Sequence, residues 1–523
     1  MPPPPGVSSA GDSSAFEISL ATTSIVFVAV LAVSLYPIVS HPIVSIDDFA
    51  NHLGRIWVLR HYQQIPELHR YFVPYWRFQP DLAMDVVVGV LARFLPVYLA
   101  GKMFLASTFI LVLVGVIRLH KAAFGTWSLW PFLAALLLYN RDLLSGLASF
   151  LFGVGLYLNV VALWIDLGRR SAILRAIVLT VLAMLLYLAH LFAAGLLGLT
   201  LLGYQLSACR RSGCGWRTAT GALASVLLPF VPALLMFLYL SPHADTSWVI
   251  EYRSFLTRIA AFGVPVLYDV WTDSLMVLAV AVLLSFLLAT GALRLHRGLA
   301  TAAALLLVAQ LAMPNRILTA TSVDHRIPIA MLLLLIAATD VVTTSRRSMF
   351  AFVIMILLFV PLRVWIIDQR WTRNDSVYAA ILVGLDSLPP HAVVATVFPP
   401  SAATRADARA IAAYSLPAWR IPQRGGFTQT VFALPAQHPM KLTPEHAAWA
   451  RKYTADTLWE MFVTDPSTPQ RADIDDELKA ALGHCDYLAF IDNESFAVPQ
   501  TDLLAKVYDD PYIKIYRVRH DPL

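Results

Sequence analysis

The chain contains 523 residues, of which 58% are hydrophobic and only 14% are charged, and its mean hydropathy is +0.65. This composition excludes a soluble globular protein, in which about 25% of residues are charged, and it indicates a polytopic membrane protein. The formal net charge of +5 does not predict a nucleic-acid partner, because Lys and Arg in a membrane protein follow its topology. The three cysteines form neither a disulfide framework nor a zinc motif.

The N-terminal segment is rich in Pro and Ser over residues 1–14, which predicts a disordered tail. The apolar run that follows, residues 15–39, is too long for the hydrophobic region of a signal peptide and has no clear cleavage site. It is therefore predicted to be an uncleaved signal anchor that forms the first membrane crossing.

Further apolar stretches recur along the chain as far as residue 367. Several are close to the lower limit of the ~17–25 residues that a helix needs to cross a bilayer. Together with the first run they predict a transmembrane helical bundle over residues 15–367, with about eleven crossings. The later stretches are 98–117, 127–139, 146–165, 173–189, 191–207, 219–240, 274–293, 299–313, 327–338 with an extension to 344, and 349–367.

Basic residues gather in every second loop between these stretches. Because short cytoplasmic loops accumulate Lys and Arg, this alternation predicts a cytoplasmic N-terminus and an extracytoplasmic C-terminus. The basic residues are Arg118 and Lys121; Arg169, Arg170 and Arg175; Arg210, Arg211 and Arg217; Arg294 and Arg297; and Arg346 and Arg347.

Two segments are interpreted so that this alternation is preserved. Residues 85–97 are apolar enough to cross, but that crossing would reverse every later loop, so we expect an amphipathic helix in the outer interface. They belong to the first outer loop, residues 40–97. Residues 173–207 could form one long helix, yet basic residues flank both ends, so a break is predicted at His190.

The composition changes sharply after residue 367, and residues 368–523 predict an extracytoplasmic α/β domain. About 150 residues are enough for a separate core. The segments with strand patterns are 392–398, 487–492 and 512–518, and those with helical spacing are 376–388, 443–453 and 474–482.

The segment SIDDFANHLGR, residues 45–55, directly follows the first crossing. Acidic groups near hydrocarbon are costly, so they are functional hypotheses by default. A helix starting at Asp47 or Asp48 would place Asp48, His52 and Arg55 on one face. A carboxylate held there against His and Arg can act as a general base, whereas the alternative is that Asp47 or Asp48 merely caps the helix. Spacing alone leaves both interpretations open.

With these features the chain resembles the GT-C superfamily of polyprenyl-phosphate-dependent glycosyltransferases. The resemblance rests on the outer loop bearing Asp47 and Asp48 after the first helix, the interfacial helices before the second crossing, the number of crossings and the outer C-terminal domain. SIDDFANHLGR is its only motif-level match. In that family an Asp of this loop is the catalytic base or helps to bind a metal, which implies one of these roles for Asp47 or Asp48. A divalent cation, Mg²⁺ or Mn²⁺, is the only cofactor implied.

The resemblance has limits. Signatures of the protein mannosyltransferase and oligosaccharyltransferase branches are missing, so the sugar, the acceptor and the branch are not implied.

A second polar group occupies residues 314–328 and supplies Arg316, Asp324, His325 and Arg326. Cationic side chains at the interface could bind a lipid phosphate and neutralise the charge that develops on it as a leaving group. The alternative is that the arginines reach for headgroups while Asp324 pairs with Arg326 or caps the next helix.

Two isolated residues complete the candidate site. Arg141, in a polar turn, could contact a phosphate, and His190, at a tight outer hairpin, could position a substrate. A structural role is the alternative for each.

The sequence thus predicts a glycosyltransferase in the bacterial cytoplasmic membrane that acts on its outer face. Its partners would be a polyprenyl-phosphate sugar donor, membrane lipid and an acceptor that is a glycan, lipid or protein. A transporter or lipid flippase that uses the same acidic and His residues for coupling is the main alternative, although no inverted repeat is evident. A non-catalytic scaffold is the third.

Overall fold

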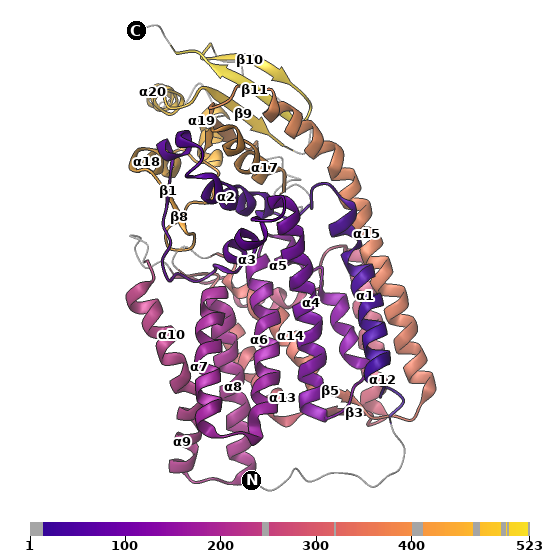
Figure 1. Ribbon diagram of the computed structural model, residues 1–523. Helices are drawn as coiled ribbons and strands as arrows, with labels where there is room; N and C mark the ends of the chain where they lie inside the picture. The colour runs from indigo at the N-terminus through magenta and orange to yellow at the C-terminus, as the bar shows by residue number, and fades with distance from the viewer. Residues whose placement is uncertain are drawn as a thin grey trace.

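The structure, a computed structural model, describes residues 14–242, 250–317, 321–399, 412–463, 471–492, 498 and 502–520. It consists of a bundle of long helices with a small sheet stacked on one end (Figure 1). The expected class, a mainly α membrane bundle with a small C-terminal sheet region, is confirmed at this level. The expected disordered tail lies almost entirely outside the described residues.

Eight helices in the described ranges are long and apolar enough to cross a membrane, so the expected number of crossings is not confirmed. Residues 127–139, expected to cross, contain the buried 3₁₀ helix η2 (Trp130–Leu137), which at ~2 Å per residue cannot span ~30 Å of hydrocarbon. The helices α13 (Arg297–Ala312) and α14 (Arg326–Ala338) are also short. The eight are α1 (Leu20–Ser40), α4 (Val97–Phe124), α6 (Ala148–Asp166), α7 (Ala172–Ala189), α8 (Leu191–Ser212), α9 with the turns after it (Trp216–Leu240), α12 (Val270–Ala289) and α15 (Arg346–Asp386).

The break between α7 and α8 falls at His190, as predicted. His190 has an extended backbone (φ −166°, ψ 124°), and its Nδ1 accepts a hydrogen bond from the N–H of Phe192 at 3.2 Å. The His side chain therefore caps α8 in place of the usual Ser, Thr, Asp or Asn. The first part of residues 85–97 belongs to the short helix α3 (Ala83–Leu91), which is separate from α4.

Among the described residues the C-terminal sheet has five strands, in the order β10-β11-β9-β6-β7. The strand β6 is parallel to β7 and β9, whereas β9, β11 and β10 are antiparallel neighbours. All five residues of β6 are buried, as expected for a central strand covered on both faces. The predicted strands 392–398, 487–492 and 512–518 are thereby confirmed as β6 (Val393–Val397), β9 (Tyr487–Ile491) and β11 (Ile513–Val518); β7 is Phe427–Thr428 and β10 is Leu504–Asp509.

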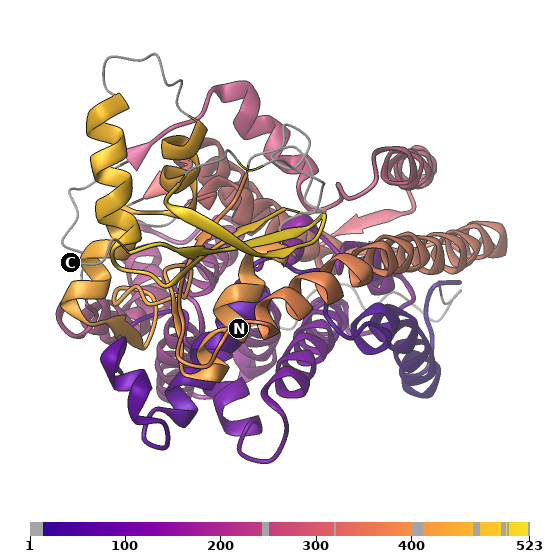
Figure 2. The same cartoon turned by 90° about the horizontal axis from the view of Figure 1, so that it is seen from above.

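The bundle and the sheet are joined by α15, whose 41 residues run without a break past the boundary expected at residue 367. The helix expected at 376–388 is the end of α15 rather than a separate element. Figure 2, seen from above, shows the sheet lying over the bundle. The helices packed around the sheet are α17 (Ala412–Arg420), α18 (Pro444–Lys452), α19 (Ala455–Val463) and α20 (Arg471–Leu482), of which α18 and α20 were expected.

The first outer loop belongs structurally to the C-terminal region. Its strand β1 (Phe72–Pro74) pairs antiparallel with β8 (Met440–Leu442), and Phe72 packs in one core with Phe427 and Met440. Its helix α2 (Phe49–His61) lies so close to α17 that a Cβ added at Gly54 would be 2.1 Å from the carbonyl oxygen of Ala418. The two segments therefore form one unit above the bundle.

The remaining elements are short and connect the long helices. They are η1 (Pro66–Arg70), α5 (Arg141–Leu144), η3 (Leu167–Arg169), η4 (Leu228–Phe230), α10 (Val231–Leu235), η5 (Met236–Leu240), β2 (Ile250–Glu251), α11 (Phe255–Ala260), η6 (Ala261–Gly263), β3 (Leu293–Leu295), β4 (Arg316–Ile317), η7 (Val323–His325), β5 (Thr339–Val341) and η8 (Pro422–Arg424).

Candidate functional site

The acidic pair lies where the chain turns from α1 into α2. Asp48 precedes α2 in the left-handed region (φ 56°, ψ −13°) and makes no side-chain capping hydrogen bond. Such a conformation is costly for a residue other than Gly, although Asp and Asn tolerate it best. The Asp47 carboxylate accepts a hydrogen bond from the N–H of Asp48 at 2.8 Å, whereas the Asp48 carboxylate forms no hydrogen bond with any described residue. Helix capping therefore does not explain Asp48.

The turn after α5 holds this pair in place. The N–H of Asp47 donates to the carbonyl oxygen of Leu144 at 2.8 Å. Gly146, in the left-handed region at φ 85°, packs so closely that a Cβ there would be 2.3 Å from the carbonyl oxygen of Asp47. Only Gly fits both the conformation and the space.

Burial and mutual repulsion change the acidity of the pair. Burial, together with the Asp48 charge, raises the pKa of Asp47 well above its ordinary range. Burial raises the pKa of Asp48 to about 7, and the nearby Arg55 guanidinium acts in the opposite direction. A carboxyl with a pKa close to neutrality is suited to accept and release a proton.

Arg55 and His52 lie on α2 beside the pair, as their spacing predicted. The Arg55 guanidinium is fully buried and forms two hydrogen bonds with Asp85 of α3, Nε to Oδ1 at 2.8 Å and Nη2 to Oδ2 at 2.9 Å. Arg55 Nη2 also lies 2.8 Å from His52 Nδ1. A guanidinium only donates, so His52 Nδ1 is the acceptor and the ring proton is on Nε2. Burial, reinforced by Arg55, lowers the pKa of His52 and keeps it neutral.

Asp85 was missed by the sequence interpretation, and it changes the role of Arg55. A buried Arg with a bidentate carboxylate partner is a structural ion pair that joins α2 to α3. The only signal in the sequence was a single carboxylate in an apolar stretch.

A second group of charged residues surrounds η7. Asp324 is fully buried, Arg253 Nη1 lies 2.8 Å from His325 Nε2, and the same guanidinium lies 3.9 Å from Asp324. Burial lowers the pKa of His325, with Arg253 and Arg141 acting in the same direction and Asp324 opposing them. His325 is therefore a neutral imidazole that lies beside the Arg253 guanidinium and the buried Asp324.

The helix α5 connects the two groups, because it supplies Arg141 and Asp142 next to the turn that holds Asp47. Arg141 is exposed, whereas Asp142 is buried and its Oδ2 forms no hydrogen bond with a described residue. Burial raises the pKa of Asp142 to about 7, against the influence of Arg326 and Arg141. Asp142 is a further acid that the sequence interpretation treated as an ordinary polar turn.

His190 and Arg326 belong to the same end of the bundle. His190 Nε2 lies 3.3 Å from Asp81 Oδ1, and burial lowers the pKa of His190 to about 4 with Arg326 contributing. The Arg326 guanidinium is buried, lies 5.1 Å from the Phe192 ring centre and donates to the carbonyl oxygen of Thr321 at 3.4 Å. Arg326 is therefore held within the protein and does not extend to headgroups.

Arg316 lies on β4, which is in contact with η7, the element that carries Asp324 and His325. It pairs with Glu251 across the short ribbon of β2 and β4, with Nη1 3.4 Å from Oε1. The backbone of β4 thus brings Arg316 close to Asp324 and His325, whereas its guanidinium pairs with Glu251.

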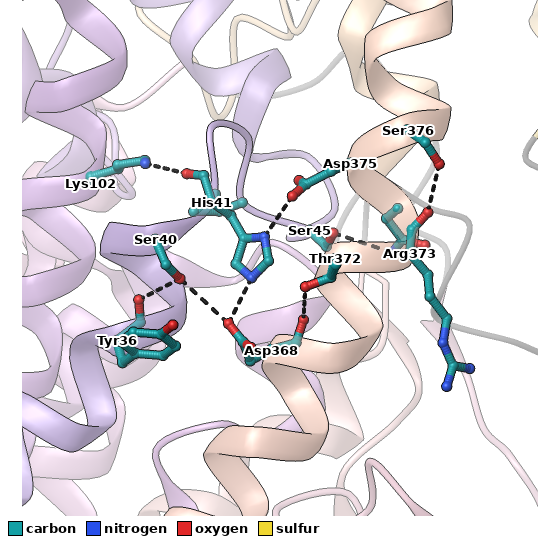
Figure 3. A network of polar contacts seen from close by, with 12 residues as sticks. Tyr36, Ser40, His41, Ser45, Lys102, Asp368, Thr372, Arg373, Asp375 and Ser376 are labelled. Atoms are coloured by element: carbon teal, nitrogen blue, oxygen red, sulfur yellow. Dashed lines mark hydrogen bonds and ion pairs between the residues drawn. The ribbon is translucent and has the colours of Figure 1, made fainter.

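A polar network fixes the loop that leads to the acidic pair (Figure 3). His41, at the end of α1, lies between two carboxylates of α15: Nδ1 is 2.9 Å from Asp375 Oδ2 and Nε2 is 3.0 Å from Asp368 Oδ1. Asn374 then donates to Ser45 Oγ at 3.2 Å. These contacts tie the first residues of the motif to the helix that carries the C-terminal sheet.

Within the described ranges no three His, Cys, Asp or Glu side chains lie close enough together to hold a metal ion. Asp47 and Asp48 are the pair of acids from the motif, and one Asp pair alone does not define a metal site. Comparison with protein-family models and with curated proteins found no match to this chain.

Proposed function

We propose that the protein is a membrane glycosyltransferase that moves a sugar from a polyprenyl-phosphate-linked donor to an acceptor hydroxyl. The observation that carries this proposal is the Asp48 carboxylate. It is partly buried, lies in a left-handed conformation, forms no hydrogen bond with the described residues and has a pKa of about 7. These are the properties of a general base rather than of a helix cap.

The chemistry assigns a role to each group. Asp48 accepts the proton of the acceptor hydroxyl as the hydroxyl oxygen bonds to the anomeric carbon. The bond from that carbon to the phosphate oxygen breaks at the same time, and the lipid phosphate leaves with the electron pair. The configuration at the anomeric carbon is inverted. Positive charge from Arg141, Arg253 and the region around Arg326 stabilises the departing phosphate.

The distribution of these residues favours an enzyme over a transporter. The start of α2, with Asp47, Asp48 and His52, lies at the end of the bundle that carries the sheet, and so does the break between α7 and α8 at His190 (Figure 1). A coupled transporter is expected to place such groups near the bilayer midplane instead. We therefore propose a reaction at one membrane face.

We further propose that this face is the outer side of a bacterial cytoplasmic membrane, because the basic loops lie at the other end. A reporter fused after residue 520 tests this orientation. Thiol labelling does not, since Cys485 is only 2% exposed.

The test of function uses purified protein in proteoliposomes with a panel of polyprenyl-phosphate hexoses and pentoses, and it measures released polyprenyl phosphate and transferred sugar. Asp48→Asn is expected to lower turnover by ~10²-fold or more, the usual scale for loss of a general base. Asp47→Asn is expected to have a smaller effect, because an Asn oxygen can still accept from the Asp48 N–H. Glu67→Gln, which removes an exposed carboxylate from the same loop, is the matched control. Full activity of Asp48→Asn on a donor that the wild type uses would refute the assignment.

Donor binding is tested separately through Arg141, which is exposed and can be changed without opening the core. Arg141→Gln is expected to raise KM for the donor by about tenfold, the scale of one charged hydrogen bond. An unchanged KM would remove Arg141 from the phosphate site.

A further inference from the structure

A second site lies at the end of the bundle opposite the acidic pair. There a groove of about 640 Å³ opens between the last turns of α8 and the start of α13. Ser207, Arg210 and Arg211 form one wall, and Arg297 and Thr301 form the other. Because α8 has 22 residues and begins beside His190, the groove is about 30 Å from the candidate active site.

The groove is strongly basic. Arg210, Arg211 and Arg297 are exposed, and none of them forms an ion pair with an acid of the described residues. The nearby Arg294 differs, because its Nη2 lies 2.8 Å from Asp340 Oδ2. The three arginines therefore present uncompensated charge to a ligand.

The half-buried His296 lies next to these arginines. His296 precedes α13 and caps it, with Nδ1 accepting from the N–H of Leu299 at 3.3 Å. Burial lowers the pKa of His296 to about 4, and Arg211 and Arg294 act in the same direction. His296 thus stays neutral and adds no positive charge to the groove.

The walls of the groove are rigid because the two helices are in close contact. A Cβ added at Gly203 of α8 would be 2.5 Å from the Cα of Ala302 in α13. Arginines on such a scaffold lose little freedom of the backbone when they bind an anion.

The floor of the groove continues onto an apolar face. Ala300 and Ala304 line it one helical turn apart, and the next residue on that stripe, Val308, is 64% exposed with Leu307 beside it. Helical residues four apart lie on one face. A ligand with a phosphate in the groove would therefore have its apolar part along α13.

We propose that this groove binds the phosphate headgroup of an anionic phospholipid from the leaflet at this end of the bundle. Guanidinium groups match phosphate geometry through paired hydrogen bonds, and basic pockets between membrane helices are suited to acidic headgroups. The continuous apolar stripe favours a lipid over a free phosphate compound. The site is independent of the proposed transfer reaction.

The experiment measures lipid retention by native mass spectrometry of the full-length protein, released from nanodiscs of phosphatidylcholine mixed with phosphatidylglycerol. The wild type is expected to retain phosphatidylglycerol selectively. The triple change Arg210→Gln, Arg211→Gln and Arg297→Gln is expected to lower that selectivity at least tenfold, since each basic residue near an anionic surface contributes about fivefold.

The matched control changes three other exposed arginines of the predicted basic loops, as Arg217→Gln, Arg346→Gln and Arg347→Gln. It is expected to retain the wild-type selectivity. An equal loss in both triple variants would overturn the proposal, because it would show that general surface charge attracts the lipid. A wild type without selectivity would also overturn it, because no headgroup would then be bound preferentially.

A second arm distinguishes lipid from soluble phosphate. Inorganic pyrophosphate is titrated against the detergent-purified wild type. Weak binding that leaves phosphatidylglycerol in place supports the lipid, whereas tight binding that displaces it and depends on the same three arginines overturns the lipid assignment in favour of a soluble anion. Gel filtration of each variant confirms that it is folded.

Discussion

Replacing Asp48 with Asn is expected to stabilise the protein while it removes activity. In the folded protein the Asp48 carboxylate loses water without gaining a hydrogen bond from a described residue. Asn has nearly the same shape, tolerates the left-handed conformation and carries no charge to desolvate. A residue with only a capping role would show neither effect.

The size of the expected stabilisation by Asp48→Asn follows from the pKa of Asp48. Burial raises the pKa of Asp48 from 3.8 to about 7. A tenfold change in proton affinity corresponds to about 1.4 kcal/mol, so the ionised group lowers the free energy of unfolding by at most about 4 kcal/mol. Because the side chain keeps some contact with solvent, we expect about 1–2 kcal/mol.

The sign of the pH dependence is fixed by the same values. Below pH 3.8 the carboxyl is protonated in the folded and unfolded states, and it contributes no penalty. As pH rises toward 7 the unfolded state loses its proton first, so the wild type loses stability, and the loss is complete above pH 7. The Asn variant has no carboxyl at this position and therefore does not lose this stability as pH rises.

Thermal unfolding in detergent at about pH 8 and about pH 4.5 measures the effect. Asp48→Asn is expected to raise the midpoint by about 2 °C or more at the higher pH and by less at the lower pH. The Glu67→Gln control is expected to change neither value. A variant that is less stable than the wild type at the higher pH would refute the argument, because it would show that the charge has a stabilising partner.

Two glycine substitutions with matched controls test the geometry around the acidic pair. Gly146→Ala is expected to lower transfer activity strongly, because its Cβ would meet the Asp47 carbonyl oxygen. Its control, Gly125→Ala, is at φ 83° but in open space, so it should cost only about 1 kcal/mol of stability. Activity assays and thermal unfolding distinguish the two variants. Gly54→Ala is expected to separate α2 from α17 and reduce the yield of folded protein in gel filtration, while Gly89→Ala in α3 has nothing within 4 Å and should be neutral or slightly stabilising. Wild-type behaviour of Gly146→Ala or Gly54→Ala would contradict the close packing described at that position.

Much of the local structure could be predicted from the sequence. The three predicted strands occur as β6, β9 and β11, and the break at His190 occurs without any Gly or Pro. These predictions depended on residue patterns and on the placement of basic loops, both of which are local properties of the chain. The start of α2 next to Asp48 was predicted for the same reason.

The remaining features depend on contacts between distant segments. The sequence placed Arg55 on one face with Asp48 and His52, but it did not indicate that Asp85, thirty residues later, pairs with Arg55 at hydrogen-bond distance. The pairing of β1 with β8 joins segments that are far apart in the chain, and no local pattern indicates it. Hydropathy also marked residues 127–139 as a crossing, because a buried 3₁₀ segment such as η2 is as apolar as a membrane helix.

The two interpretations of the motif differ in backbone geometry, which spacing cannot report. A capping Asp needs an extended backbone so that its carboxylate can reach the N–H groups of the first turn. Asp48 is left-handed instead, and Asp47 accepts the hydrogen bond from the Asp48 N–H. The folded chain thus bears both a strained backbone and a desolvated carboxylate at one residue, with no hydrogen bond from the described residues to offset them. Costs of this kind persist at sites of function, and this is the strongest physical reason to look for the reaction at Asp48.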